Sequence, residues 1–223
     1  MNGLTLLVIA KAPVAGRVKT RLSPPCTPME AADLAEGALI DTLRTVIGCP
    51  ADRHVIALDG QPGPWLPPGF EVFAQRGDGL DERLAAAFAD VFNTEAEPHR
   101  VVLVGMDTPQ VTADDLAIAS GLLTTHDAVI GMAHDGGWWC IGLNARNDEV
   151  FLRIPMSLKT TGDEQLRRLM DHDLRVAHLR PLLDVDTFDD ALAVAAELNA
   201  TGHASSFAAR VVNVQQRQGA HDN

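Results

Sequence analysis

Short apolar runs alternate along the chain with longer stretches in which apolar residues recur every three or four positions. The apolar runs predict strands over residues 4–10, 53–58, 70–74, 100–105, 127–132, 138–143 and 174–179. The periodic stretches predict helices over residues 29–46, 80–92, 112–123, 161–171 and 187–199, and one helical turn over 148–153. Strands that alternate with helices predict an α/β fold with a mainly parallel sheet and helices on both faces.

One connection between two apolar runs is too short for a helix. His134-Asp-Gly-Gly137 separates the run at 127–132 from the run at 138–143. The two glycines permit positive φ, as tight turns between antiparallel strands require. We therefore expect a short antiparallel element in the otherwise parallel sheet.

Length and composition indicate one globular domain. Of the 223 residues 46% are apolar, and residues 1–202 carry all the predicted elements. Residues 203–223 are mostly polar, so we expect a tail that is loosely held or covers an edge. The net charge of −12 argues against non-specific binding of nucleic acid, because a duplex would repel most of the surface.

Cysteine usage and hydropathy indicate a cytoplasmic protein. The three cysteines form no C-x-x-C pair, which fits a reducing compartment. No stretch approaches 18 apolar residues, and the first apolar run lacks a basic region before it. We expect neither a membrane span nor a signal peptide.

The first predicted strand is followed by a basic segment that inverts the overall charge. Four of the 18 lysines and arginines, Lys11, Arg17, Lys19 and Arg21, lie between residues 11 and 22, before the first acidic residue. Gly16 stands among small residues, so backbone N–H groups could approach a ligand closely. A bound polyanion such as a nucleotide phosphate explains this segment, and a solvated basic loop is the alternative.

Several well-known active-site patterns are absent from the sequence. Neither G-x-G-x-x-G nor G-x-x-x-x-G-K-[ST] occurs, which leaves out the dinucleotide fingerprint and the P-loop. H-E-x-x-H and G-x-S-x-G are also absent. Zinc hydrolysis and serine-nucleophile chemistry therefore have little support.

Two acidic positions follow predicted strands and are candidate metal ligands. Asp107 comes directly after the run at 100–105, and a carboxylate at a strand end suits Mg²⁺ or Mn²⁺. It could instead cap the turn or helix that begins near Thr112. Asp184 and Asp186 share one face of an extended segment and could supply a second ligand, while Thr187 caps the next helix.

The turn at residues 134–137 leads into two tryptophans that must point to opposite faces of a strand. One of Trp138 and Trp139 should be core, and the other could line a pocket. Asp135 could face an acceptor substrate or a metal. A plain hairpin with a core tryptophan is the alternative.

Five motifs in a fixed order carry a family resemblance. They are K-A-P-x-x-G-x-x-K-T-R-L at 11–22, Q-R-G-x-x-L-x-E-R-L at 75–84, G-x-D-x-P at 105–109, D-G-G-W-x-x-I-G-L at 135–143 and D-V-D-T at 184–187. Together they resemble the rSAM/selenodomain-associated transferase family of the nucleotide-diphospho-sugar transferase superfamily. The K-T-R-L-S-P and D-V-D-T segments are also similar to 2-phospho-L-lactate guanylyltransferases. The resemblance extends over about residues 4–198.

This resemblance implies a single-domain, Rossmann-like GT-A fold with an assigned site. The implied nucleotide and phosphate contacts are Ala10, Lys11, Gly16, Arg17, Lys19, Arg21, Gln75, Arg76 and Gly77. The implied catalytic residues are Lys11, Lys19 and Asp107, the metal ligands Asp107 and Asp186, and the acceptor pocket Asp135, Gly136, Gly137 and Trp138. Sugar transferases of this fold usually carry Asp-x-Asp at the central strand, whereas here a single Asp follows Met106.

Three functions are compatible with these residues. The first is Mg²⁺- or Mn²⁺-dependent nucleotidyl transfer from an NTP to a small phosphorylated or hydroxylated acceptor, since four cations suit a triphosphate. The second is glycosyl transfer from a nucleotide-sugar, and the third is nucleotide binding without turnover. No motif indicates a nucleic-acid or membrane partner, and a homodimer remains open.

Overall fold

The computed structural model describes residues 3–94, 99–202 and 204–221. Its strands are β1 (Gly3–Lys11), β2 (Arg53–Asp59), β3 (Glu71–Ala74), β4 (His99–Gly105), β5 (Ala128–Ala133), β6 (Trp138–Leu143) and β7 (Val176–Leu182). Its helices are α1 (Pro28–Ile47), α2 (Leu80–Asn93), α3 (Ala113–Leu122), α4 (Thr161–Asp171), α5 (Phe188–Ala200) and α6 (Ser206–His221), with 3₁₀ turns η1 (Thr20–Leu22) and η2 (Asp148–Val150). Within these residues no helix combines the length and apolar character needed to cross a membrane.

All seven strands form one sheet in the order β3-β2-β1-β4-β6-β5-β7. Strand β6 runs antiparallel to β4 and β5, and the other neighbouring pairs are parallel. The predicted α/β class and the short antiparallel element are thus confirmed. Because β6 is reversed, its first residue lies at the edge where the parallel strands end.

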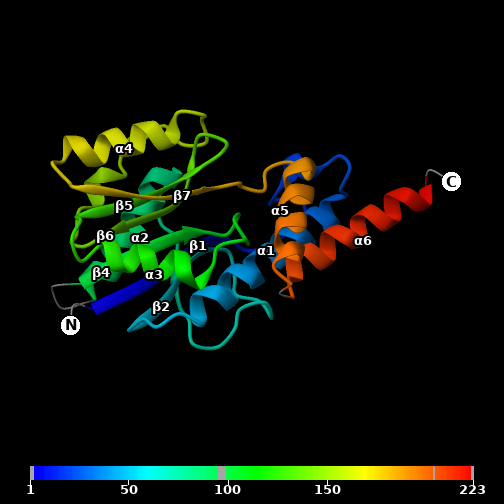
Figure 1. Cartoon of the computed structure of the whole chain (residues 1–223), viewed down its shortest axis with the longest axis horizontal. Helices are drawn as coiled ribbons and strands as arrows, with labels where there is room; N and C mark the ends of the chain where they lie inside the picture. The colour runs from blue at the N-terminus through cyan, green and yellow to red at the C-terminus, as the bar shows by residue number, and fades with distance from the viewer. Residues whose placement is uncertain (1–2, 95–98, 203, 222–223) are drawn as a thin grey trace.

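Helices cover both faces of the sheet, as Figure 1 shows. On one face α1 packs on β1 and α3 packs on β4, in one apolar cluster that includes Leu39, Val8 and Leu116. On the other face Leu84 and Phe88 of α2 pack with η2 and the α4 side chain Leu169. Central strands covered on both sides explain why β1 and β4 are continuous apolar runs.

Residues 203–223 were expected to be loosely held or to cover an edge, but residues 206–221 form helix α6. Phe207, Val211 and Val214 are buried against α1 and α5 in a third apolar cluster. These residues follow a spacing of four and three, which is helical. Figure 1 shows α6 packed beside α5 at its start and running away from the sheet to the C-terminus.

Candidate functional site

A cavity of about 530 Å³ lies over the carboxyl ends of β1 and β4. In open α/β sheets, ligands bind at this edge. The predicted residues that line it are Ala10, Lys11, Arg17, Lys19, Arg21, Gln75, Asp107, Asp135, Gly137, Trp138, Asp184 and Asp186. Residues that were not predicted as site residues line it as well, among them Leu80, Arg83, Met156 and Leu158.

Lys19 is the basic-segment residue that the fold buries. Its side chain is 9% exposed, and Nζ lies 2.8 Å from Asp107 Oδ1 and 3.6 Å from Asp186 Oδ1. The same Nζ donates a hydrogen bond to the Val185 carbonyl. Because this ammonium is buried and contacts three oxygens, Lys19 does not belong to a solvated surface loop.

The backbone and charge of Lys19 are both set by its neighbours. Its φ of 47° lies in the left-handed region, which residues with a Cβ rarely adopt. Buried Val18 and Leu22 hold the chain on either side. Burial by itself would lower the pKa of Lys19, but the Asp107 carboxylate, followed by Asp186 and Asp184, outweighs burial and raises that pKa.

The environment of the cavity raises the pKa of Asp184. Among the described residues, its buried Oδ1 has no hydrogen-bond partner. Burial, followed by the charges of Asp107 and Asp135, raises the pKa of Asp184 to about 8, although Lys19 opposes the shift. Both predicted acidic residues of this segment, Asp184 and Asp186, line the cavity.

Two further cations are held on the opposite wall by one carboxylate. Asp59 Oδ2, at the end of β2, lies 3.5 Å from Lys11 Nζ and 3.2 Å from Arg83 Nη1. Arg83 Nε also donates to the Gly77 carbonyl at 3.1 Å. Arg83 was not among the predicted site residues. The available signal was a cation on the helix stripe that also carries Leu80 and Leu84.

The remaining cations of the basic segment face solvent. Arg21 is 68% exposed at its side chain and pairs with Asp186 at 2.9 Å. Arg17 is exposed, lines the cavity and forms no ion pair with the residues that the structure describes. Arg17 is therefore available to an anionic ligand without first breaking a contact.

The β5–β6 turn forms the wall that was predicted to contact an acceptor. Asp135 Oδ1 accepts a hydrogen bond from the Gly137 N–H at 2.8 Å, which holds its carboxylate at the cavity. Trp138 is half-buried and lines the cavity, whereas Trp139 is buried and donates to the Arg180 carbonyl at 3.0 Å. Trp139 is core, as expected for one of the pair, but it borders the cavity as well, as Trp138 does.

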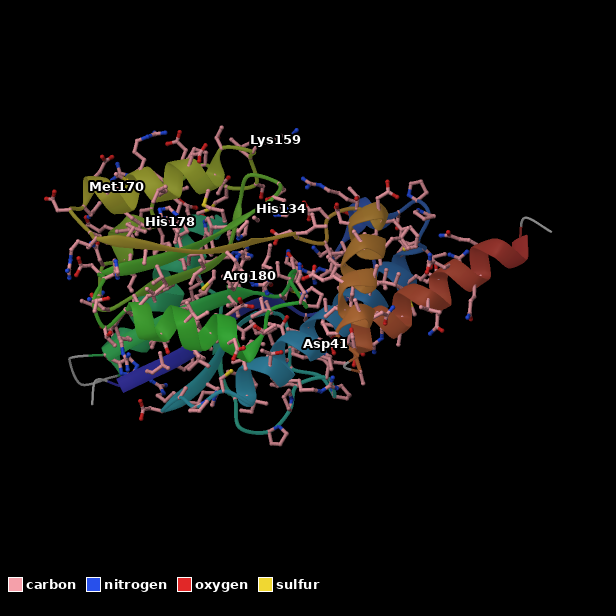
Figure 2. All side chains as sticks on the ribbon, in the orientation of Figure 1. Asp41, His134, Lys159, Met170, His178 and Arg180 are labelled. Atoms are coloured by element: carbon pink, nitrogen blue, oxygen red, sulfur yellow. The ribbon has the colours of Figure 1, made fainter. Side chains whose placement is uncertain are left out.

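The loop before α4 packs tightly on this turn. Gly136 accepts a hydrogen bond from the Gly162 N–H at 2.8 Å and leaves no room for a Cβ beside the Lys159 carbonyl. Figure 2 shows Lys159 and His134 near one another, in the middle of the view between α4 and α5. The contact brings Met156 and Leu158 to the cavity as an apolar wall that only the tertiary structure assembles.

Four predicted site residues do not line the cavity, namely Gly16, Arg76, Gly77 and Gly136. Arg76 instead forms an ion pair with Asp90 of α2. Gly16, with φ 76°, and Gly136 shape their turns without lining the cavity. Gln75 does line it, and its amide donates to two strand carbonyls, which ties β1 to β2.

The acidic residues allow a partial metal site. No group of three or more His, Cys, Asp or Glu side chains in the described ranges is arranged to hold a metal ion. Asp107 and Asp186 nevertheless share one cation, the Lys19 ammonium. Two carboxylates suit Mg²⁺ or Mn²⁺, which commonly take their other ligands from water and substrate phosphate.

The sheet order and the charged cavity at the strand ends define a protein with the nucleotide-diphospho-sugar transferase fold. A protein from Desulfovibrio desulfuricans G20, provisionally described as a nucleotide-diphospho-sugar transferase, has 27% sequence identity and a TM-score of 0.85. The match covers 97% of this chain and 98% of that one. The chain belongs to the family described as "Uncharacterized protein conserved in bacteria (DUF2064)", whose model matches residues 38–158.

More distant structures share the fold. CMP:2-keto-3-deoxy-manno-octonic acid synthetase, complexed with CTP, is 11% identical with a TM-score of 0.56, over 91% of this chain and 100% of that one. Rv0371c from Mycobacterium tuberculosis H37Rv, complexed with manganese, is 20% identical with a TM-score of 0.50, over 86% and 97%. No curated protein matches the chain. The superfamily resemblance is confirmed, and the rSAM-associated and guanylyltransferase resemblances stay predictions.

Proposed function

We propose that the protein is a transferase that binds an NTP with Mg²⁺ or Mn²⁺ and transfers the nucleotidyl group to a small phosphorylated or hydroxylated acceptor. The observation that carries this proposal is the Lys19 ammonium held between Asp107 and Asp186 at the cavity. The similar structures include a synthetase complexed with CTP and a protein complexed with manganese. Both kinds of ligand agree with the residues of this cavity.

The cations would bind and orient the phosphate chain. An acceptor oxygen forms a bond to the α-phosphorus while the bond from that phosphorus to the bridging oxygen of pyrophosphate breaks. Lys11, Arg17 and Arg83 lie on the cavity wall where they would neutralise the charge that leaves with pyrophosphate. Asp107 and Asp186 would hold the metal ion, which when bound lowers the negative charge on phosphate oxygens.

Asp135 and Trp138 would position the acceptor. The Asp135 carboxylate keeps one oxygen beyond its bond to Gly137, and that oxygen can accept from an acceptor hydroxyl. Trp138 offers a half-buried ring face at the same wall. Holding the acceptor in line with the phosphate chain supplies catalysis through proximity, which this class of reaction needs most.

Glycosyl transfer from a nucleotide-sugar is the second candidate. It is favoured by the description of the protein from Desulfovibrio desulfuricans G20. Two features favour nucleotidyl transfer from an NTP instead. A single Asp107 stands in place of Asp-x-Asp, and five cations line the cavity. In the glycosyl reaction a nucleoside diphosphate, not pyrophosphate, would leave.

Product analysis separates the two reactions. The protein is incubated with Mn²⁺, each NTP or a UDP- or GDP-sugar, and mixed sugar phosphates and polyols. Release of pyrophosphate that depends on an acceptor supports nucleotidyl transfer, and release of a nucleoside diphosphate supports glycosyl transfer. NTP binding without either product supports a binding module and refutes both. Arg76→Ala serves as a control variant for nucleotide binding. Its cation pairs with Asp90 outside the cavity, so its loss should leave nucleotide binding unchanged.

A further inference from the structure

The position between Asp107 and Asp186 is already occupied by a cation of the protein. Lys19 Nζ contacts carboxylate oxygens of both residues and the Val185 carbonyl. Oxygen atoms of this kind are also the ligands that Mg²⁺ and Mn²⁺ prefer. The ammonium therefore occupies the position that a divalent ion would require.

The backbone that carries the two carboxylates is held by contacts that do not involve Lys19. The Val185 N–H donates to the Asp107 carbonyl at 3.0 Å, which joins the segment after β4 to the segment before α5. The box formed by Thr187 and Asp190 caps α5 and holds the other end of that segment. Removing the lysine side chain should therefore leave the backbone of both acidic residues in place, with their carboxylates within reach of one ion.

The Lys19 side chain can leave while its backbone stays. Buried Val18 and Leu22 fix the chain on each side. The lysine side chain has four rotatable bonds, and the same cavity contains the cationic wall of Lys11 and Arg83 where phosphate would bind. A phosphate oxygen offers the ammonium a new partner within the cavity.

An ammonium and a divalent ion exclude each other from this position. Two cations about 4 Å apart repel one another strongly in a partly buried site. Metal binding to the empty protein must therefore first break the contacts of Lys19 with Asp107 and Asp186.

We propose that Lys19 blocks the Asp107–Asp186 metal position in the nucleotide-free protein, and that nucleotide phosphates draw its ammonium away so that nucleotide and divalent metal bind cooperatively. This rests on the proposed function, because it assigns phosphate and metal to the same cavity. Linkage requires the effect to be reciprocal: nucleotide raises metal affinity by the factor by which metal raises nucleotide affinity.

The test measures Mn²⁺ binding to the full chain without nucleotide, by titration calorimetry and the loss of the free Mn²⁺ spin-resonance signal. Lys19→Met should bind Mn²⁺ at least about tenfold more tightly than the wild type, because it removes a competing charge without adding a ligand. Lys11→Met is the matched control, since this lysine pairs with Asp59 and should leave Mn²⁺ affinity unchanged. Asp107→Asn in the Lys19→Met background should abolish the gain.

Equal Mn²⁺ affinity of the wild type and Lys19→Met would overturn the inference, as would a gain that survives Asp107→Asn. Lys19→Gln serves as a second uncharged variant, and melting temperatures show that each variant is folded. Titration of the wild type with Mn²⁺ in the presence of ATP, CTP, GTP or UTP tests the proposed function separately. If none of them binds, the proposed function fails, whereas the comparison without nucleotide still decides whether Lys19 blocks the metal position.

Discussion

Asp41 of α1 is the residue on which we expect the attachment of α6 to depend. Its carboxylate accepts hydrogen bonds from the Ser206 and Phe207 N–H groups at 2.9 Å and from the Ser205 hydroxyl at 2.7 Å. The residue is 7% exposed. Figure 2 shows it beside the start of α6. The carboxylate thus satisfies N–H groups at a helix end that have no partner within the helix.

Asp41→Asn tests this attachment with little change in volume. The substitution removes the charge and turns one acceptor into a donor that faces an N–H or O–H group. A hydrogen bond to a charged group contributes about 1.5–3 kcal/mol. The three bonds do not add fully, because water can reach the start of α6 once it loosens. We expect the free energy of unfolding to fall by about 2–3 kcal/mol.

Urea unfolding followed by circular dichroism measures this loss, and a thermal melt checks it. For a chain of this size, each kcal/mol lost from the free energy of unfolding lowers the melting temperature by about 2–4 °C. The melting temperature of Asp41→Asn should therefore fall by about 4–12 °C. Glu36→Gln is the matched control, because Glu36 also joins α1 to α6, through a partly exposed ion pair with Arg210 at 3.0 Å. The control should cost less than about 1 kcal/mol. If Asp41→Asn lowers the free energy of unfolding by less than about 0.5 kcal/mol, or by no more than Glu36→Gln does, the reasoning is refuted.

Three further predictions concern the site and the core. Asp107→Asn should lower metal-dependent turnover by about a hundredfold or more, since even residues that only contact a metal ligand contribute about 10–100-fold. The melting temperature should stay near that of the wild type. Turnover that is retained in this variant would show that Asp107 does not hold the metal. Burial opposes ionisation of Asp115, but Arg180, at 2.6 Å, and Thr112 hold its pKa below the unfolded value of about 3.9. The ionised Asp115 therefore stabilises the fold above a pH of about 3.9, and this stabilisation is lost as pH falls through the folded pKa of Asp115. The difference in unfolding free energy between the wild type and Arg180→Met should accordingly become smaller on acidification. A difference that does not change with pH would contradict this prediction. All three cysteines are buried, and burial raises the pKa of Cys140, so a thiol reagent should label none in the native protein and three in urea; rapid native labelling would show that this part of the core opens.

The order of elements could be predicted from the sequence because the signal is local. Apolar periodicity needs only neighbouring residues, so the strand at 100–105 and the helix at 161–171 were both expected where β4 and α4 lie. The capping signals at Thr112 and Thr187 are equally local, and both capping boxes form. Helix α6 was missed because its apolar stripe is sparse and its anchor, Asp41, lies on a distant helix.

The candidate site was predictable only as far as strand ends could be located. Lys11 and Asp107 each follow a predicted strand, and the carboxyl ends of parallel strands meet at one edge. Both residues line the cavity at that edge. Arg76 was assigned to the same site by resemblance, yet it turns away to Asp90. A position in a motif does not determine where a long side chain points, because the side chain takes the partner that packing offers.

The sequence by itself determined the strand and helix pattern, the positive charge of residues 11–22, and the opposite facing of Trp138 and Trp139. These features depend on residues that are adjacent in the chain. Only the tertiary structure decided that Lys19 is buried between Asp107 and Asp186, and that burial raises the pKa of Asp184 to about 8. Burial and the field of neighbouring charges exist only after distant segments have packed together, so no local pattern can encode them.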